Sequence, residues 1–287
     1  MRFPPPADWP MAAQSRQILC RPHRWHVQRA GDGPTILLIH GAGGATQSFR
    51  HLFPLLTESY DTVAIDLPGQ GFTQMGARHR CGLDGMAEDL LALLRQEGIK
   101  PHLVVGHSAG VAVALRMVEL GLRPSAGIFG INAALGNFKG VAGWLFPAMA
   151  KVLAATPFSA DLFCATTTAS SVRNLIHGTG SRLGADGEAL YLALAKDTTH
   201  VSATLAMMAQ WSLDGLLERL PDIDTPVTLI TGAADKAVPP GTSTTAAAAL
   251  PNATVIALPE LGHLAHEEDA AQIATLIQNA TGRQGLP

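Results

Sequence analysis

The sequence is poor in the features that mark secreted, membrane-spanning and nucleic-acid-binding proteins. It has only three cysteines in 287 residues, Cys20, Cys81 and Cys164. They are far apart in the sequence, and no two of them form a C-x-x-C motif. A disulfide framework and a thiolate zinc site are therefore not expected. The formal net charge is −3 and lysines and arginines form no cluster, which argues against nucleic acid as a partner.

Long apolar runs are also missing, although 47% of the residues are hydrophobic. No stretch reaches about 18 uninterrupted apolar residues, so no transmembrane segment is predicted. Residues 1–6 (MRFPPP) lack the apolar core of a secretion signal. We therefore expect a cytoplasmic protein with a sizeable core, long enough for one large α/β domain with an insertion or for two domains.

Apolar runs alternate with helical patterns over most of the chain. Two short strands are predicted at 16–20 and 25–28, and solid apolar runs predict further strands at 35–39, 62–66, 103–105, 126–131, 226–232 and 253–258. Helical spacing of apolar residues occurs at 83–97, 109–120 and 266–280. Strands that are apolar throughout are typical of a mostly parallel sheet covered by helices on both faces, so the fold class is α/β.

The alternation stops in the middle of the chain. Residues 135–211 show no strand–helix repeat, and helices are expected at 144–155, 168–177, 187–194 and 201–211. The strands on either side of this stretch belong to one sheet. We therefore predict a core domain formed by residues 1–134 and 212–287 and an inserted helical cap at 135–211.

The pattern Gly106-x-Ser108-x-Gly110 lies between a predicted strand and a predicted helix. A sharp strand-to-helix turn leaves little room for side chains two residues from its apex, and glycine lets the backbone approach closely there. Such a turn exposes the serine at the C-terminal end of the strand, beside a helix N-terminus. The context predicts that Ser108 is a nucleophile, and a chance glycine-serine turn is the alternative.

A serine nucleophile needs a base and a carboxylate that orients the base. In this kind of sheet they follow the serine in the order Asp or Glu, then His. Asp235 lies in the loop after the strand at 226–232, and His263 lies in the loop after the last predicted strand. We predict a triad of Ser108, Asp235 and His263, with a turn-forming role as the alternative for Asp235.

Backbone N–H groups should stabilise the oxyanion that forms in such a reaction. We assign these groups to Ala109, next to the nucleophile, and to Ala42 in the glycine-rich loop after the strand at 35–39. The same loop raises dinucleotide binding as an alternative. It departs from the G-x-G-x-x-G pattern, because the last position is Thr46.

His263 and His266, with Glu267 beside them, raise the further alternative of a metal-binding pair at helical spacing. A third ligand has no clear candidate, and we expect His266 to be a polar surface residue at the start of the last helix. The triad chemistry needs no metal and no organic cofactor, so none is predicted.

Five motifs together resemble the α/β-hydrolase superfamily. They are HGAG at 40–43, DLPGQG at 66–71, GHSAG at 106–110, GAAD at 232–235 and GH at 262–263. The resemblance covers residues 16–135 and 212–281. It implies an α/β-hydrolase fold with a helical cap over the site, and hydrolysis of an ester or amide.

More narrowly, the chain resembles the magnesium-chelatase accessory proteins of bacteriochlorophyll biosynthesis, a group within that superfamily. The segments that carry this are 8–10 (DWP), 24–28 (RWHVQ), 178–183 (GTGSRL), 200–201 (HV), 206–209 (AMMA) and 261–268 (LGHLAHEE). The resemblance implies a role in magnesium-tetrapyrrole synthesis, with a tetrapyrrole or magnesium chelatase as partner. Catalysis and binding without catalysis both remain open, because a fold does not settle a function.

The predicted cap carries large apolar side chains that suit a pocket for a bulky apolar ester or amide. Our candidates for the pocket are Trp144, Phe146, Met149, Met208 and Trp211. Packing of these side chains on one another is the alternative. For the segment 141–152, burial over the site is favoured over contact with a membrane surface.

Overall fold

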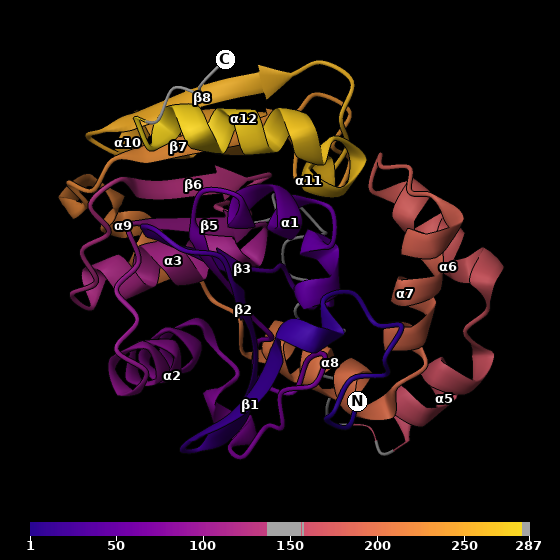
Figure 1. Cartoon of the computed structure of the whole chain (residues 1–287). Coiled ribbons are helices and arrows are strands. Elements are labelled where there is room, and N and C mark those ends of the chain that lie inside the picture. Colours follow the sequence, from indigo (N-terminus) through magenta and orange to yellow (C-terminus); the bar gives the residue numbers. More distant parts are fainter. Residues whose placement is uncertain (137–155, 157, 283–287) are drawn as a thin grey trace.

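An eight-stranded sheet runs through the protein, whose computed structural model describes residues 1–136, 156 and 158–282 (Figure 1). The strand order is β1-β2-β4-β3-β5-β6-β7-β8. β2 pairs antiparallel with both β1 and β4, and all other neighbours are parallel. The predicted fold class, a mostly parallel sheet flanked by helices with an inserted helical region, is confirmed.

All eight predicted strands are present, with bounds that differ from the prediction by only a few residues. They are β1 Ser15–Cys20, β2 His23–Ala30, β3 Thr35–Ile39, β4 Asp61–Ile65, β5 Leu103–His107, β6 Gly127–Ile131, β7 Val227–Gly232 and β8 Ala253–Leu258.

The helices outside the inserted region pack on the two faces of the sheet. They are α1 Leu52–Thr57, α2 Leu83–Gln96, α3 Ala109–Glu119, α9 Asp214–Glu218, α10 Gly241–Ala249, α11 Ala265–Glu268 and α12 Ala270–Ala280. Short 3₁₀ turns occur at η1 Ala12–Gln14, η2 Thr46–Phe49, η3 Arg78–Arg80 and η4 Leu220–Asp222.

Alternate residues of one strand explain why its sequence is apolar throughout. Leu37 and Ile39 of β3 belong to a buried cluster with side chains of α2, α3 and α10. Their neighbours Ile36 and Leu38 belong to a second cluster, with side chains of α1 and α12. Both faces of the strand are therefore removed from water, as expected for a parallel sheet with helices on each side.

The predicted helix at 266–280 is wrong in one respect, because it is two helices, α11 and α12. Asp269 separates them with φ −141° and ψ 77°, which are not helical angles. Its carboxylate accepts a hydrogen bond from the backbone N–H of Gln272, which caps the start of α12.

Four described helices belong to the inserted region, between β6 and α9. They are α5 Ser159–Thr166, α6 Ala169–Gly178, α7 Ala185–Ala195 and α8 Thr198–Gln210. Figure 1 shows α5, α6 and α7 on the right of the view, to one side of the sheet. The helix expected at 144–155 and the segment 141–152 lie outside the described residues. Over the described ranges, no helix is long and apolar enough to cross a membrane.

Candidate functional site

Four parallel strands in a row end at the same edge of the sheet, and a polar residue follows each of them. Ser108 follows β5, Asn132 follows β6, Asp235 lies in the loop after β7, and His263 lies in the loop after β8. The order of the strands therefore brings together side chains that are up to 155 residues apart in the sequence. Asn132 was not among the predicted site residues.

Ser108 lies at the apex of a strained turn between β5 and α3. Its φ of 51° and ψ of −116° lie in a region that residues other than glycine rarely adopt. A Cβ on Gly110 would lie 2.3 Å from the carbonyl oxygen of Ile39, and one on Gly106 would lie 2.7 Å from the Gly110 carbonyl carbon. Only glycine at both positions lets α3 pack this closely against the sheet, and that packing turns Ser108 outward.

Asp235 and His263 are in direct contact. Asp235 Oδ2 lies 2.9 Å from His263 Nδ1, and the carboxylate is buried. Because a carboxylate only accepts hydrogen bonds, a neutral His263 ring has its proton on Nδ1 and its lone pair on Nε2. This is the tautomer in which an imidazole can act as a base at Nε2.

Three further donors hold the Asp235 carboxylate in place. The backbone N–H groups of Ala237 and Val238 each donate to Oδ1 at 2.8 Å. The side-chain amide of Asn132 donates to Oδ2 at 2.8 Å. The position of Asn132, directly after an apolar strand beside the serine strand, is the signal that could have identified it from the sequence.

His107, the residue before Ser108, is in contact with His263. The His107 Nε2–H donates to the carbonyl oxygen of His263 at 2.9 Å, and the two ring centroids are 4.9 Å apart. Burial lowers the pKa of His107 well below its usual range, and the nearby His266 and His263 lower it further. Within the described part of the chain, no hydrogen bond joins Ser108 Oγ to the His263 ring.

The glycine-rich loop after β3 lies against the nucleophile. A Cβ on Gly41 would lie 3.0 Å from the Cβ of Ser108, so the two backbones are in close contact. The Gly43 N–H donates to the side-chain oxygen of Gln70, and the Gly44 N–H donates to the Gly41 carbonyl. The Ala42 N–H donates to no described residue. The Ala109 N–H lies in the first turn of α3, where a helix offers it no acceptor.

Two buried histidines hold the carbonyl groups of this loop. The His40 Nδ1–H donates to Gly41 O at 2.7 Å, and its Nε2 accepts from the Leu67 N–H at 2.9 Å. His200 of α8 donates from Nε2 to Gly43 O at 3.2 Å and accepts the Gly71 N–H at Nδ1. Burial lowers the pKa of His40 and brings that of His200 to about 4, so both rings are neutral.

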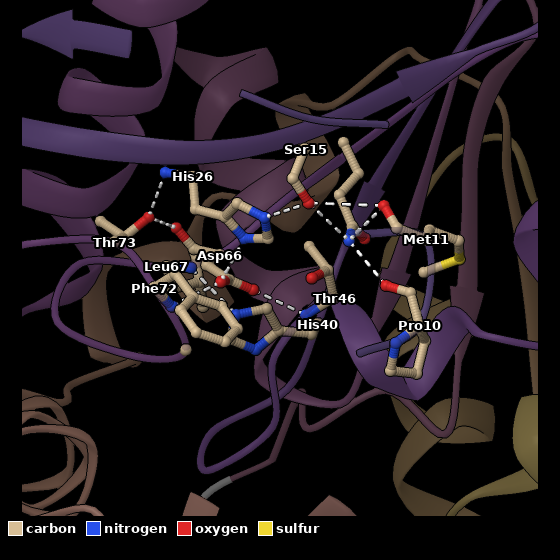
Figure 2. A network of polar contacts seen from close by, with 12 residues as sticks. Pro10, Met11, Ser15, His26, His40, Thr46, Asp66, Leu67, Phe72 and Thr73 are labelled. Atoms are coloured by element: carbon tan, nitrogen blue, oxygen red, sulfur yellow. Dashed lines mark hydrogen bonds and ion pairs between the residues drawn. The ribbon is translucent and has the colours of Figure 1, made fainter. Parts of the chain in front are cut away.

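Asp66, a buried carboxylate directly after β4, holds the end of the glycine-rich loop through the Thr46 N–H. Asp66 Oδ1 accepts from the Thr46 N–H at 2.7 Å, and Oδ2 accepts from the Phe72 N–H and contacts His26 Nδ1 at 2.6 Å (Figure 2). Burial alone would raise the pKa of Asp66. Its interactions with His26, with His40 and with the Phe72 N–H outweigh burial and lower the pKa to about 2.

The expectation that His266 is a surface residue is wrong. Its side chain is fully buried, with ring centroids 4.4 Å from His107 and 5.2 Å from Phe49. The short helix α11 carries it inward, and burial lowers its pKa to about 3. Over the described ranges, no group of three or more His, Cys, Asp or Glu side chains is arranged to hold a metal ion.

The predicted pocket residues fall in different surroundings. Trp144, Phe146 and Met149 lie outside the described residues. Met208 of α8 is 40% exposed, and Trp211 is half-buried against the core cluster that includes α2 and α3. The apolar pocket stays a prediction.

Comparison with known proteins gives both a family and close relatives. The sequence profile described as "alpha/beta hydrolase fold" matches residues 34–270. The chain is 43% identical over 275 residues to the magnesium-chelatase 30 kDa subunit of Rhodobacter capsulatus, a match that covers 95% of this chain and 96% of that protein.

More distant matches have different names. The dihydrolipoyllysine-residue acetyltransferase component of the acetoin cleaving system of Pseudomonas putida is 28% identical, covering 91% of this chain and 67% of that protein. The crystal structure of an alpha/beta hydrolase fold protein from Burkholderia ambifaria superposes with a TM-score of 0.76 at 21% identity, covering 93% and 97% of the two chains. This last likeness concerns the fold alone.

The buried histidines make the stability of the protein sensitive to acid, and His200 provides the test. Its pKa is about 4 in the folded chain and about 6.5 when unfolded. Between these values the unfolded chain binds a proton that the folded chain does not. The free energy of unfolding therefore falls as pH falls, by up to about 1.4 kcal/mol per pH unit for this one residue.

We expect His200→Gln to make this pH dependence shallower, measured by urea unfolding from about pH 7 to about pH 4.5. The matched control is His177→Gln, which changes an exposed histidine of α6 and should keep the wild-type slope. Equal slopes for wild type and both variants would contradict the assignment of a neutral, buried His200.

Proposed function

Because the chain belongs to the α/β-hydrolase fold family, we propose that it is a serine hydrolase that cleaves an ester or amide with a bulky apolar part. The observation that carries the proposal is the hydrogen bond between Asp235 and His263. It forms at the edge of the sheet where the parallel strands end, and Ser108 follows one of these strands. The four donors on Asp235 are an arrangement suited to holding one imidazole tautomer.

The proposed reaction begins when Ser108 Oγ attacks the substrate carbonyl carbon and His263 Nε2 takes the hydroxyl proton. The carbonyl oxygen becomes an oxyanion that accepts hydrogen bonds from the Ala42 and Ala109 N–H groups. The tetrahedral intermediate then expels the alcohol or amine, which takes the proton from His263, and leaves an acyl-serine. Water attacks the acyl group and gives a proton to His263, which passes it to Ser108 Oγ as the acid is released, so that both residues return to their starting state.

The name of one relative supports a proposal about the pathway in which this reaction takes place. The magnesium-chelatase 30 kDa subunit matches this chain along almost its whole length. We propose that the protein works in magnesium-tetrapyrrole synthesis, where a tetrapyrrole would be the bulky apolar group. The second candidate function, favoured by the same relationship, is to bind a tetrapyrrole or the chelatase without catalysis.

The first test is whether Ser108 is an activated nucleophile. A fluorophosphonate probe should label the protein once, at Ser108, because His263 can remove the hydroxyl proton as the oxygen attacks phosphorus. Mass spectrometry of the labelled peptide locates the site. Ser108→Ala should abolish labelling, whereas Ser171→Ala, at an exposed position of α6, should leave it unchanged. Folded protein that stays unlabelled at neutral and mildly alkaline pH would contradict the catalytic proposal.

The second test concerns the carboxylate that orients His263. We expect Asp235→Asn to lower kcat by about 10⁴-fold, the cost of the wrong imidazole tautomer in a serine protease. The same change at Asp214, Asp222 or Asp224, which are exposed, should have little effect. The measurement is hydrolysis of a chromogenic ester by the four purified variants. Similar, mild losses at all four positions would refute the role of Asp235.

The third test asks whether the protein binds a tetrapyrrole. Saturable quenching of tryptophan fluorescence by micromolar protoporphyrin is expected for wild type and equally for Ser108→Ala. Arg182 is exposed, whereas Arg173 is already paired with Glu188. Arg182→Gln should weaken binding about tenfold if it contacts a porphyrin carboxylate. Arg21→Gln, an exposed control in the β1–β2 turn, should not.

The porphyrin result separates the two candidate functions. Binding with Ser108 labelling supports the hydrolase in this pathway, and binding without labelling supports the non-catalytic role. Labelling without saturable quenching would leave an ester or amide hydrolase with no tetrapyrrole in its site.

A further inference from the structure

A short segment of the inserted region, residues 179–182, lies between the two loops that carry Asp235 and His263. We call this segment the strap. It follows α6 and precedes α7, and its sequence, Thr-Gly-Ser-Arg, lies within one of the segments that resemble the chelatase accessory proteins. The serine hydrolase mechanism assigns these residues no task.

The strap is in direct backbone contact with the Asp235 loop. The Lys236 N–H donates to the Thr179 carbonyl at 3.0 Å. Gly180 has a φ of 89°, and a Cβ built on it would lie 1.9 Å from the Ala234 carbonyl oxygen. Any side chain at this position would force the strap and the loop apart.

The strap also holds the His263 loop. The Ser181 side chain is fully buried, and its Oγ accepts the N–H of Leu264, the residue after His263, at 2.8 Å. The Leu264 side chain packs with Val172 and Ile176 of α6. The residues on the C-terminal side of His263 are therefore held by the inserted helices.

A carboxylate from α11 connects the strap to the other side of His263. Glu268 Oε2 accepts the Gly262 N–H at 2.8 Å, and Oε1 accepts the Arg182 N–H at 2.9 Å. The backbone N–H groups on both sides of His263, at Gly262 and Leu264, thus depend on the strap or on its partner Glu268.

The place of β8 in the sheet explains why such support is needed. β8 is the last strand, pairs only with β7, and is largely exposed along its length. The loop that follows it has a neighbouring strand on one side only. The strap contacts both this loop and the loop after β7, which adds to the support that the single neighbouring strand gives.

We infer that the strap is a positioning element, which holds His263 in register with Asp235 through Gly180, Ser181 and Glu268. This inference rests on the proposed serine hydrolase function for its catalytic consequence. The inserted region would then be required for the geometry of the triad itself, in addition to any contact with substrate.

Gly180 in the strap and Gly178 at the end of α6 offer a matched test. Gly180→Ala places a methyl group against Ala234 O, whereas a Cβ on Gly178 meets nothing within 4 Å and Gly178 has no positive φ. We expect Gly180→Ala to lower the rate constant of fluorophosphonate labelling about 100-fold, as for a displacement of about 1 Å of a reacting group. Gly178→Ala should label at the wild-type rate. Far-ultraviolet circular dichroism checks that both variants are folded.

A second readout does not depend on activity. The Nδ1–H of His263, bonded to a carboxylate, should give a downfield imidazole signal in the proton NMR spectrum. Asp235→Asn removes the carboxylate and identifies the signal. Gly180→Ala should lose or shift it, and Gly178→Ala should keep it. Ser181→Ala removes only the acceptor for the Leu264 N–H and should give the same change. This variant takes the place of Gly180→Ala if Gly180→Ala does not fold. Ser202→Ala, in α8, is its control.

The two readouts separate the strap from the hydrolase proposal. If wild type shows the NMR signal but is not labelled, the hydrolase proposal fails, and loss of the signal in Gly180→Ala or Ser181→Ala still supports the strap. If wild type is labelled, and folded Gly180→Ala and Ser181→Ala keep both its labelling rate and its NMR signal, the strap proposal is overturned.

Discussion

The structure around the candidate site depends on one buried carboxylate, Asp235, and on its need for hydrogen-bond donors. A buried charged group without partners is strongly destabilising, and each missing donor costs roughly 1–3 kcal/mol. Asp235 obtains its donors from its own loop, from Asn132 after β6 and from His263 after β8. Satisfying this carboxylate therefore sets the relative positions of three strand ends, and the candidate base is one of the groups that are set.

Neutral imidazoles have a comparable role on the opposite side of Ser108. His40 and His200 each donate one hydrogen bond and accept another, which joins the glycine-rich loop to β4 and to α8. A protonated ring could not accept, so burial that lowers the pKa is part of what keeps the loop in place. The loop that presents the Ala42 N–H is thus held by the core and by the inserted region together.

The inserted region enters the candidate site in two places, through His200 at the glycine-rich loop and through the strap at the loops of Asp235 and His263. A protein that used this scaffold only for binding would have no need for an oriented imidazole at His263. Conversely, relatives with different names share this fold, so the fold alone does not choose the reaction. Nucleophile reactivity, imidazole geometry and tetrapyrrole binding are therefore separate properties of this scaffold, and none of them follows from another.

The sequence by itself determined the strands and the residues that follow them. Strands such as β3 are apolar on both faces, so they stand out as solid apolar runs, and Ser108, Asp235 and His263 could be found as polar residues after them. Only the tertiary structure decided which groups support these residues. Ser181 lies 83 residues from Leu264 and Glu268 lies 86 residues from Arg182, so no local pattern relates these partners. The burial of His266 likewise depends on its tertiary contacts with His107 and Phe49. Hydrophobic periodicity reports which face of an element is buried, whereas hydrogen bonds between loops depend on how the strands are ordered in space.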